Sequence, residues 1–295
     1  EFAGGFPTVA AAEGELRAMI EMIFEQPETG RFIARKLYRF FVYHFISEEV
    51  ENDIIDPLSQ VLIDTGYSLA EALKVLLKSE HFYDADDSVT SNDVRGALIK
   101  SPVDLFSGLF RLFGVDFPDR NTQPDAFYND MQYVVSKLVD QGLNFYEPFE
   151  VAGYPAYHQI PGYNRNWITT YALAHRYQAA GILMKTIDGG RERSFYLDMV
   201  RWVEHSGYIT DPSDSTELMN VLTDHLFAVD LTPERYDYFL YKVFIGFPEE
   251  DPTYARGLWR SAWQDYQSSG DDSEVRPLLE RLVSGLIETP EFQLY

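Results

Sequence analysis

The chain has 295 residues, of which 45% are hydrophobic and 15% aromatic, and its formal net charge at pH 7 is −23. A chain of this length and composition buries a sizeable apolar core, which excludes general disorder. The negative charge and the absence of any basic run exclude a nucleic-acid partner, because binding to phosphates requires clustered Lys and Arg.

The sequence also excludes several kinds of site. It contains no cysteine, so disulfides, thiolate nucleophiles and cysteine-ligated metals are absent. No apolar run reaches the roughly 18–20 residues that cross a bilayer, so we predict no membrane span. HExxH, GxSxG, P-loop and GxGxxG motifs are missing, and the acidic run Asp84–Asp93 lacks the Gly and Glu of an EF-hand loop. We therefore predict no metal site and no cofactor.

Apolar residues spaced three and four apart predict helices along most of the chain. In chain order they lie near 14–26, 29–45, 57–65, 69–81, 102–113, 124–141, 167–187, 192–204, 215–228, 233–246, 253–267 and 277–288. Small polar residues before Pro predict helix starts at Asp56, Ser101, Thr232, Asp251 and Thr289. Ser68 with Glu71 predicts a capping box. These features predict an all-α fold, an orthogonal multi-helix bundle of about ten to twelve helices.

The two ends of the chain resemble each other. Displaced along the sequence without a gap, Leu16, Met19 and Ile23 match Met219, Leu222 and Leu226. After a small further displacement, Leu69, Ser79 and Phe82 match Leu279, Thr289 and Phe292. We predict one helical domain over residues 1–295, with pseudo-repeat units 14–84 and 215–295 flanking 100–205. Amphipathic helices of similar length also match by chance, which is the alternative.

Residues 145–176, FYEPFEVAGYPAYHQIPGYNRNWITTYALAHR, interrupt the helical pattern. Pro148, Pro155 and Pro161 forbid a regular helix, while Gly153 and Gly162 permit turns. We therefore predict a long, ordered Pro/Gly/aromatic loop in the middle of the bundle. Outside this segment the histidines are scattered and are predicted to lie on helix surfaces or at caps: His44, His81, His205 and His225.

The central segment also holds the candidate site. Its rings combine apolar faces with polar edges, which stack on sugars or grip an extended peptide. The candidate ligand-binding residues are Tyr146, Tyr154, Tyr157, His158, Tyr163, Arg165, Trp167 and Arg176. An alternative is a structural plug, in which the rings pack between helices and Arg176 pairs with Glu150. A third interpretation makes Glu147, Glu150 and His158 catalytic, as in the acid/base cleavage of a glycosidic bond.

Five ordered segments carry a resemblance to a known family. Residues 147–155, EPFEVAGYP, followed by Asn166-Trp167-Ile168, Leu173 and Arg176, resemble the "P-x-x-V-x-G-W-P … W-I … L-x-x-R" signature of the bacterial domain-of-unknown-function family numbered 1800. Four further segments resemble other motifs of that family: RFIARKLYRFF at 31–41, LKSEHF at 77–82, KSPVD at 100–104 with Gly108 and Arg111, and ETPEFQ at 288–293.

The resemblance carries expectations about the whole protein. The run Tyr154–Gln159 is similar to the Bacteroidetes branch, although Tyr154 replaces the usual Trp. The family resemblance implies a helical fold and export to the periplasm, cell surface or medium. It also implies that the chain is the C-terminal portion of a longer protein. We expect a binding or scaffolding module that engages carbohydrate, peptide or a partner protein through the central aromatic segment. The alternatives are a hydrolase, or a structural loop with the active residues in a preceding region.

Overall fold

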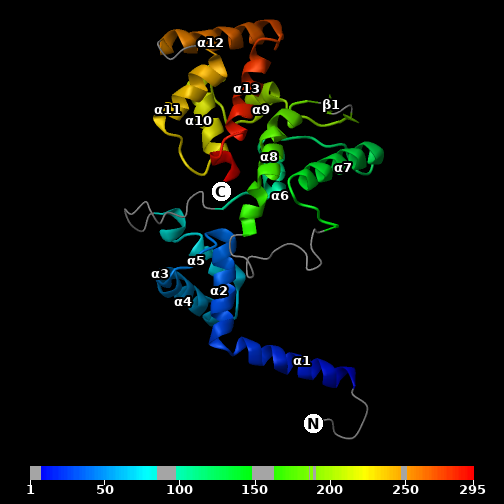
Figure 1. Cartoon of the computed structure of the whole chain (residues 1–295), viewed down its shortest axis with the longest axis vertical. Coiled ribbons are helices and arrows are strands. Elements are labelled where there is room, and N and C mark those ends of the chain that lie inside the picture. The colour runs from blue at the N-terminus through cyan, green and yellow to red at the C-terminus, as the bar shows by residue number, and fades with distance from the viewer. Residues whose placement is uncertain (1–7, 85–97, 148–162, 186, 189–190, 247–250) are drawn as a thin grey trace. The chain divides into compact units, whose positions relative to one another are not determined.

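The computed structural model describes residues 8–84, 98–147, 163–185, 187–188, 191–246 and 251–295 (Figure 1). The chain divides into two compact units: unit 1 comprises residues 1–97 with 156–162, and unit 2 comprises 98–155 with 163–295. Each unit has its own cluster of buried apolar side chains. The units are therefore described one at a time.

Unit 1 is built around helix α2. Its elements are α1 (Val9–Phe24), α2 (Pro27–Phe41), α3 (Glu48–Val50), the π-helical turn η1 (Glu51–Ile55), α4 (Asp56–Asp64), α5 (Leu69–Leu76) and the 3-10 turn η2 (His81–Tyr83). Ala34, Tyr38 and Val42 recur every fourth residue, so they share one face, and all three are buried. That face packs against α4, which contributes Leu58 and Leu62.

None of the 16 residues of helix α1 is buried. Its last turn is held to the unit, since the Tyr67 hydroxyl donates to the Phe24 carbonyl oxygen at 2.8 Å. Leu16, Met19 and Ile23 nevertheless stay 54%, 48% and 46% exposed. Their sequence counterparts on the C-terminal side are buried in unit 2, so the matched helices pack differently.

The start of the third predicted helix is wrong. Asp56-Pro57 was expected to begin it, but α3, η1 and α4 follow one another without a break from Glu48 to Asp64. The cap is Ser47, whose hydroxyl accepts from the Val50 backbone N–H at 3.1 Å. Pro57 has no N–H to donate, and the wider π-type turn just before it accommodates the proline inside a continuing helix.

Unit 2 holds the remaining helices. They are α6 (Pro102–Leu112), α7 (Pro124–Asp140), the 3-10 segment η4 (Tyr163–Ile168), α8 (Thr170–Leu183), α9 (Met199–His205), α10 (Ser215–Leu226), α11 (Pro233–Asp237), the π-helical η5 (Tyr238–Ile245), α12 (Pro252–Ser269), α13 (Val275–Ile287) and the 3-10 turn η6 (Glu291–Gln293). A hairpin of two residues per strand, β1 (Ile187–Asp188) and β2 (Arg191–Glu192), follows α8.

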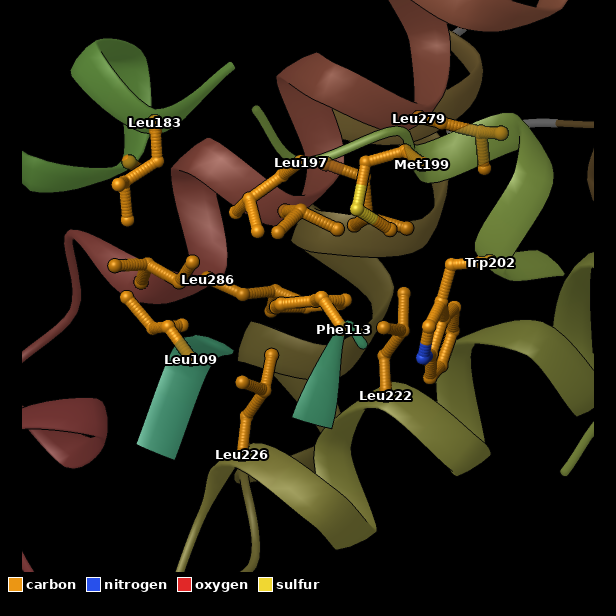
Figure 2. Close-up of a cluster of buried hydrophobic side chains, with 14 of the residues drawn as sticks. Leu109, Phe113, Leu183, Leu197, Met199, Trp202, Leu222, Leu226, Leu279 and Leu286 are labelled. Carbon is orange, nitrogen blue, oxygen red and sulfur yellow. The ribbon is translucent and has the colours of Figure 1, made fainter. Parts of the chain in front are cut away.

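Helix α13 is the centre of unit 2. It contacts η5, α8, α9, α10 and α12, and six of its side chains are fully buried. Figure 2 shows its Leu279 and Leu286 among apolar side chains of α6, α9 and α10. At Gly285 the helix comes close to η5, because a Cβ there would lie 3.0 Å from Cγ1 of Val243. A residue without a side chain therefore permits this close packing.

Residues 193–197 correct the predicted helix 192–204. They belong to no helix, and Arg193, Phe195 and Leu197 are buried while Ser194 and Tyr196 are exposed. This alternation has the period of two that an extended chain requires, and it directs Phe195 and Leu197 into the core. Helix α9 begins only at Met199, capped by Asp198, whose carboxylate accepts from the Arg201 backbone N–H.

Three predicted caps are confirmed: Ser101, Thr232 and Asp251 each accept from the backbone N–H three residues on. The predicted capping box at Ser68 is wrong, because that side chain caps nothing and Glu71 pairs instead with Lys74 at 2.7 Å. The exposed Lys74 offers a charged partner at helical spacing, and this competes with the reach back to Ser68.

The all-α, multi-helix fold is confirmed, with the short β1–β2 hairpin as its exception. In the part of the chain that the structure describes, no helix combines the length and the apolar character needed to traverse a bilayer. One domain over residues 1–295, the pseudo-repeat and the orthogonal arrangement stay predictions. Of the predicted central loop, residues 145–176, residues 148–162 lie outside the described residues, while η4 and the start of α8 occupy its C-terminal part.

One local feature is shared by the two segments that match in sequence. After α5, the Ser79 hydroxyl donates to the Leu76 carbonyl oxygen at 2.7 Å and accepts from the Phe82 N–H at 3.2 Å. After α13, the Thr289 hydroxyl donates to Leu286 at 2.7 Å and accepts from Phe292 at 3.3 Å. One hydroxyl thus ends the helix and starts the following 3-10 turn in both places.

We predict that Thr289→Ala lowers the free energy of unfolding by about 1–2 kcal/mol, because it leaves the buried Phe292 N–H without its acceptor and leaves the Leu286 carbonyl oxygen with only the Thr289 N–H. Thr289→Ser, which keeps the hydroxyl, is the matched control and should recover most of the loss. Urea denaturation followed by circular dichroism measures both. Equal destabilisation by the two variants would show that the methyl group, not the hydroxyl, matters.

Candidate functional site

Four of the ten predicted site residues lie outside the described residues: Glu150, Tyr154, Tyr157 and His158. For Tyr163 only the backbone is described, as the first residue of η4. The roles expected of these residues therefore stay predictions.

The residues that lead into the central segment are exposed. Tyr146 is 84% exposed, Phe145 is 54% exposed, and Glu147 is exposed beside them. The side-chain oxygen of Asn144 accepts from the backbone N–H groups of Tyr146 and Glu147, both at 3.3 Å, which fixes a local turn. On the far side of the segment Arg165 is also exposed. Aromatic faces and a charge are thus accessible at both ends.

Trp167 has a different environment. It lies in η4 and is only 8% exposed, within the apolar cluster of unit 2. Its ring therefore contributes to the core, as the plug interpretation expects of this residue. A contact between Trp167 and a ligand stays a prediction.

Arg176 is fully buried on α8. Its Nε donates to Oε1 of Gln293 at 2.7 Å, and its Nη2 donates to the Lys100 carbonyl oxygen at 2.9 Å. Gln293 in turn donates from Nε2 to the Ile287 carbonyl oxygen at 3.0 Å. Arg176 thus links α8, the C-terminal end of α13 and the segment before α6. The Nη1 group has no hydrogen-bond partner among the described residues.

The chain segment before α6 pairs with the C-terminal segment. The Lys100 N–H donates to the Gln293 carbonyl oxygen and the Tyr295 N–H to the Leu98 carbonyl oxygen, both at 2.9 Å. Ile99 and Leu294 lie opposite each other in an antiparallel bridge. This pairing sets the position of Lys100 immediately before the Ser101 cap of α6.

The Lys100 side chain lies beside the same network. Its Nζ donates to the Phe292 carbonyl oxygen at 2.8 Å, has a longer contact of 3.5 Å with the Leu226 carbonyl oxygen, and lies 4.3 Å from the centre of the Phe292 ring. Burial and, to a smaller extent, the positive charge of Arg176 lower the pKa of Lys100 to about 8, while the Asp104 carboxylate opposes the shift. Burial likewise lowers the pKa of Arg176 to about 10.

A pocket of about 430 Å³ opens beside Lys100. Asp104, Gly108 and Arg111 line it from α6, where spacings of four and three place them on one face. His225 of α10 lines it as well, and an apolar wall includes Leu109 and Leu226, both labelled in Figure 2. The volume lies within the ~300–1,000 Å³ typical of small-ligand pockets.

A second pocket of about 340 Å³ lies at the start of α9, and its charged groups are already paired. Burial opposes ionisation of its Asp198. The backbone hydrogen bond from Arg201 and the guanidinium of Arg276, 3.1 Å away, outweigh burial and lower the pKa of Asp198. This carboxylate both caps α9 and pairs with α13, which gives it a structural role.

The Lys100 pocket was not predicted from the sequence. Lys100 and Arg111 lie in one stretch that resembles the family's motifs, and Phe292 lies in another. The sequence pattern that marks the pocket is a Lys next to a helix cap together with an Arg farther along that helix. This pattern indicates a pocket only once the C-terminal segment is known to pack beside it.

The structure is that of an all-α protein whose larger unit carries a basic pocket. Residues of the C-terminal segment form part of the lining of this pocket. A family model described as "Protein of unknown function (DUF1800)" matches residues 3–294. The chain therefore belongs to this bacterial family, which confirms the resemblance. No curated protein and no solved structure matches the chain.

We predict that Trp167→Ala lowers the free energy of unfolding by about 3–5 kcal/mol, as removal of a large core side chain does. Trp167→Phe, which keeps most of the apolar contact, should cost clearly less. Denaturant unfolding monitored by far-UV circular dichroism measures the difference. An unchanged midpoint for the alanine variant would contradict a core role for Trp167.

We predict that Arg176→Gln raises the pKa of Lys100 above about 8, because it removes a positive charge that disfavours the protonated amine. NMR titration of the Lys100 Nζ resonance, assigned by its loss in Lys100→Met, measures the midpoint. Arg260→Gln, an exposed change on α12, is the control and should leave the midpoint in place. A fall of the midpoint in Arg176→Gln would contradict the assigned cause.

Proposed function

We propose that this protein is a binding module of an exported bacterial protein that engages an extended ligand, a carbohydrate or a peptide, through the aromatic segment 145–176. The observation that carries the proposal is the exposure of the aromatic residues near the two ends of this segment. Tyr146 is 84% exposed, and Phe145 and Tyr171 also present more than half of their surface. An exposed ring offers an apolar face without the energetic cost of first leaving a core.

The flanks of the segment add two properties that suit such a ligand. The Tyr171 ring packs against the His175 ring with ring centres 4.5 Å apart and the planes tilted by 60°, which restricts the motion of an exposed ring before any ligand binds. A ring that is already held loses less conformational entropy on binding. Arg165 adds an exposed hydrogen-bond donor on the same segment.

The hydrolase interpretation has less support. Of its three residues, only Glu147 lies in the part of the chain that the structure describes, and its side chain is exposed. A general acid needs a raised pKa, which usually comes from burial. The catalytic roles of Glu147, Glu150 and His158, and export itself, stay predictions.

We predict that Tyr146→Ala weakens binding to whichever glycan or peptide an array screen of the full chain identifies, raising its Kd about tenfold. Tyr254→Ala, an equally small change at an exposed tyrosine on α12, is the control and should leave the Kd unchanged. Isothermal titration calorimetry measures both. If Tyr146→Ala binds as tightly as the control, the aromatic segment is not the contact surface.

A further inference from the structure

The pocket beside Lys100 has an unusual charge for this protein. The chain as a whole carries a net charge of −23, yet the side chains that line the pocket include Lys100, Arg111 and His225 against one side-chain carboxylate, Asp104. The Asp104 carboxylate already accepts a hydrogen bond of 2.5 Å from the Ser101 hydroxyl. The side chains of the lining are therefore net positive and attract an anion.

Arg176 lies behind this lining and strengthens its positive field. It is fully buried, its Nε and Nη2 donate to neutral oxygen atoms, and its Nη1 has no hydrogen-bond partner among the described residues. A buried cation that lacks a carboxylate partner is energetically costly. A nearby anion reduces that cost by favourable Coulomb interaction across a medium of low dielectric constant.

Lys100 and Arg111 both have donors to offer. The ammonium group of Lys100 has three N–H donors, of which the Phe292 carbonyl takes one at 2.8 Å and the Leu226 carbonyl a weaker second at 3.5 Å. The Arg111 guanidinium is exposed and makes no hydrogen bond or ion pair with the residues that the structure describes. It presents a planar fork that matches a carboxylate.

The walls of the pocket indicate what the rest of the ligand is. Leu105, Leu109, Leu226 and Phe227 supply an apolar surface next to the cations. Gly108 leaves space in the middle of the α6 face, because a Cβ added there would meet nothing within 4 Å. This combination suits an anion with an apolar body better than inorganic phosphate or sulfate.

We propose that the pocket beside Lys100 binds a small organic carboxylate, with the carboxylate group between Lys100 and Arg111 and the apolar body against the leucine wall of α6 and α10. The proposal does not rest on ligand binding by the aromatic side chains of residues 145–176. A monoanion suits the lining, since one of its cations is already balanced by Asp104.

The test uses hexanoate as the probe and calorimetric titration of the full chain. We expect a Kd on the order of 1 mM, as befits a ligand of few atoms. Hexan-1-ol, which has the same apolar body without charge, and inorganic sulfate, which has charge without the body, should each bind more weakly by about tenfold or more.

Two variants keep the test independent of folding defects. Arg111→Ala removes an exposed guanidinium and should weaken hexanoate about tenfold, while Arg260→Ala on α12 should have no effect. Gly108→Leu fills the open space on α6 and should abolish binding, although replacing a helical glycine favours the helix. Lys100→Met is less informative, because it also removes the bond to the Phe292 carbonyl oxygen.

A pH titration provides a second readout. The charged groups that face Lys100 are Arg176 from α8, Asp104 and Arg111 from α6, and His225 from α10. A bound carboxylate favours the protonated amine, so saturating hexanoate should raise the pKa of Lys100 above about 8. By linkage, the affinity should fall as the pH rises through that range. The same pH dependence of the hexanoate affinity should be measured in the His225→Gln variant, which lacks the imidazole of His225.

Specific results would overturn the proposal. Equal affinities of the Arg111→Ala and Arg260→Ala variants would remove Arg111 from the site, and unchanged binding by Gly108→Leu would place hexanoate elsewhere. Hexan-1-ol as strong as hexanoate would exclude carboxylate recognition, and sulfate as strong would exclude the apolar body. A pKa of Lys100 that moves in the Glu150→Gln variant, while hexanoate leaves it unchanged, would show that a carboxylate of the chain itself, and not a ligand, balances the positive charge.

Discussion

Unit 2 depends on the burial of helix α13. Six fully buried side chains and the close approach at Gly285 fix this helix against η5, α8, α9, α10 and α12. Each fully buried aliphatic side chain contributes about 1.5–3 kcal/mol of transfer free energy, so the helix outweighs any single polar contact in the unit. The order of the surrounding helices follows from the need to cover it.

The end of α13 positions the residues that line the Lys100 pocket. The Thr289 hydroxyl closes the helix and opens η6, which brings Gln293 to Arg176 and pairs residues 293–295 with residues 98–100. Lys100 is therefore placed by a chain of contacts that begins at the core. We expect a change at the end of α13 to alter the surroundings of an amine far away in the sequence, because backbone hydrogen bonds join residues 98–100 to residues 293–295.

Lys100 and Arg176 are cations in a buried network, and their surroundings disfavour their charged forms. Burial lowers both pKa values, and the positive charge of Arg176 also lowers that of Lys100. The surrounding carbonyl oxygens hold the amine without neutralising it. Such a group stays charged at neutral pH and still responds to a nearby anion, and this makes it suited to recognition.

The sequence by itself determined the helical class, the caps at Ser101, Thr232 and Asp251 and the family, because caps and apolar periodicity are local properties. It misplaced the start at Asp56, since a proline within a π turn looks like a helix start. Only the tertiary structure decided that Arg176 is a buried link and not a loop cation, and that Lys100 borders a basic pocket. These facts depend on contacts between residues 100, 176 and 293, and no local pattern encodes a pairing across so long a stretch of chain.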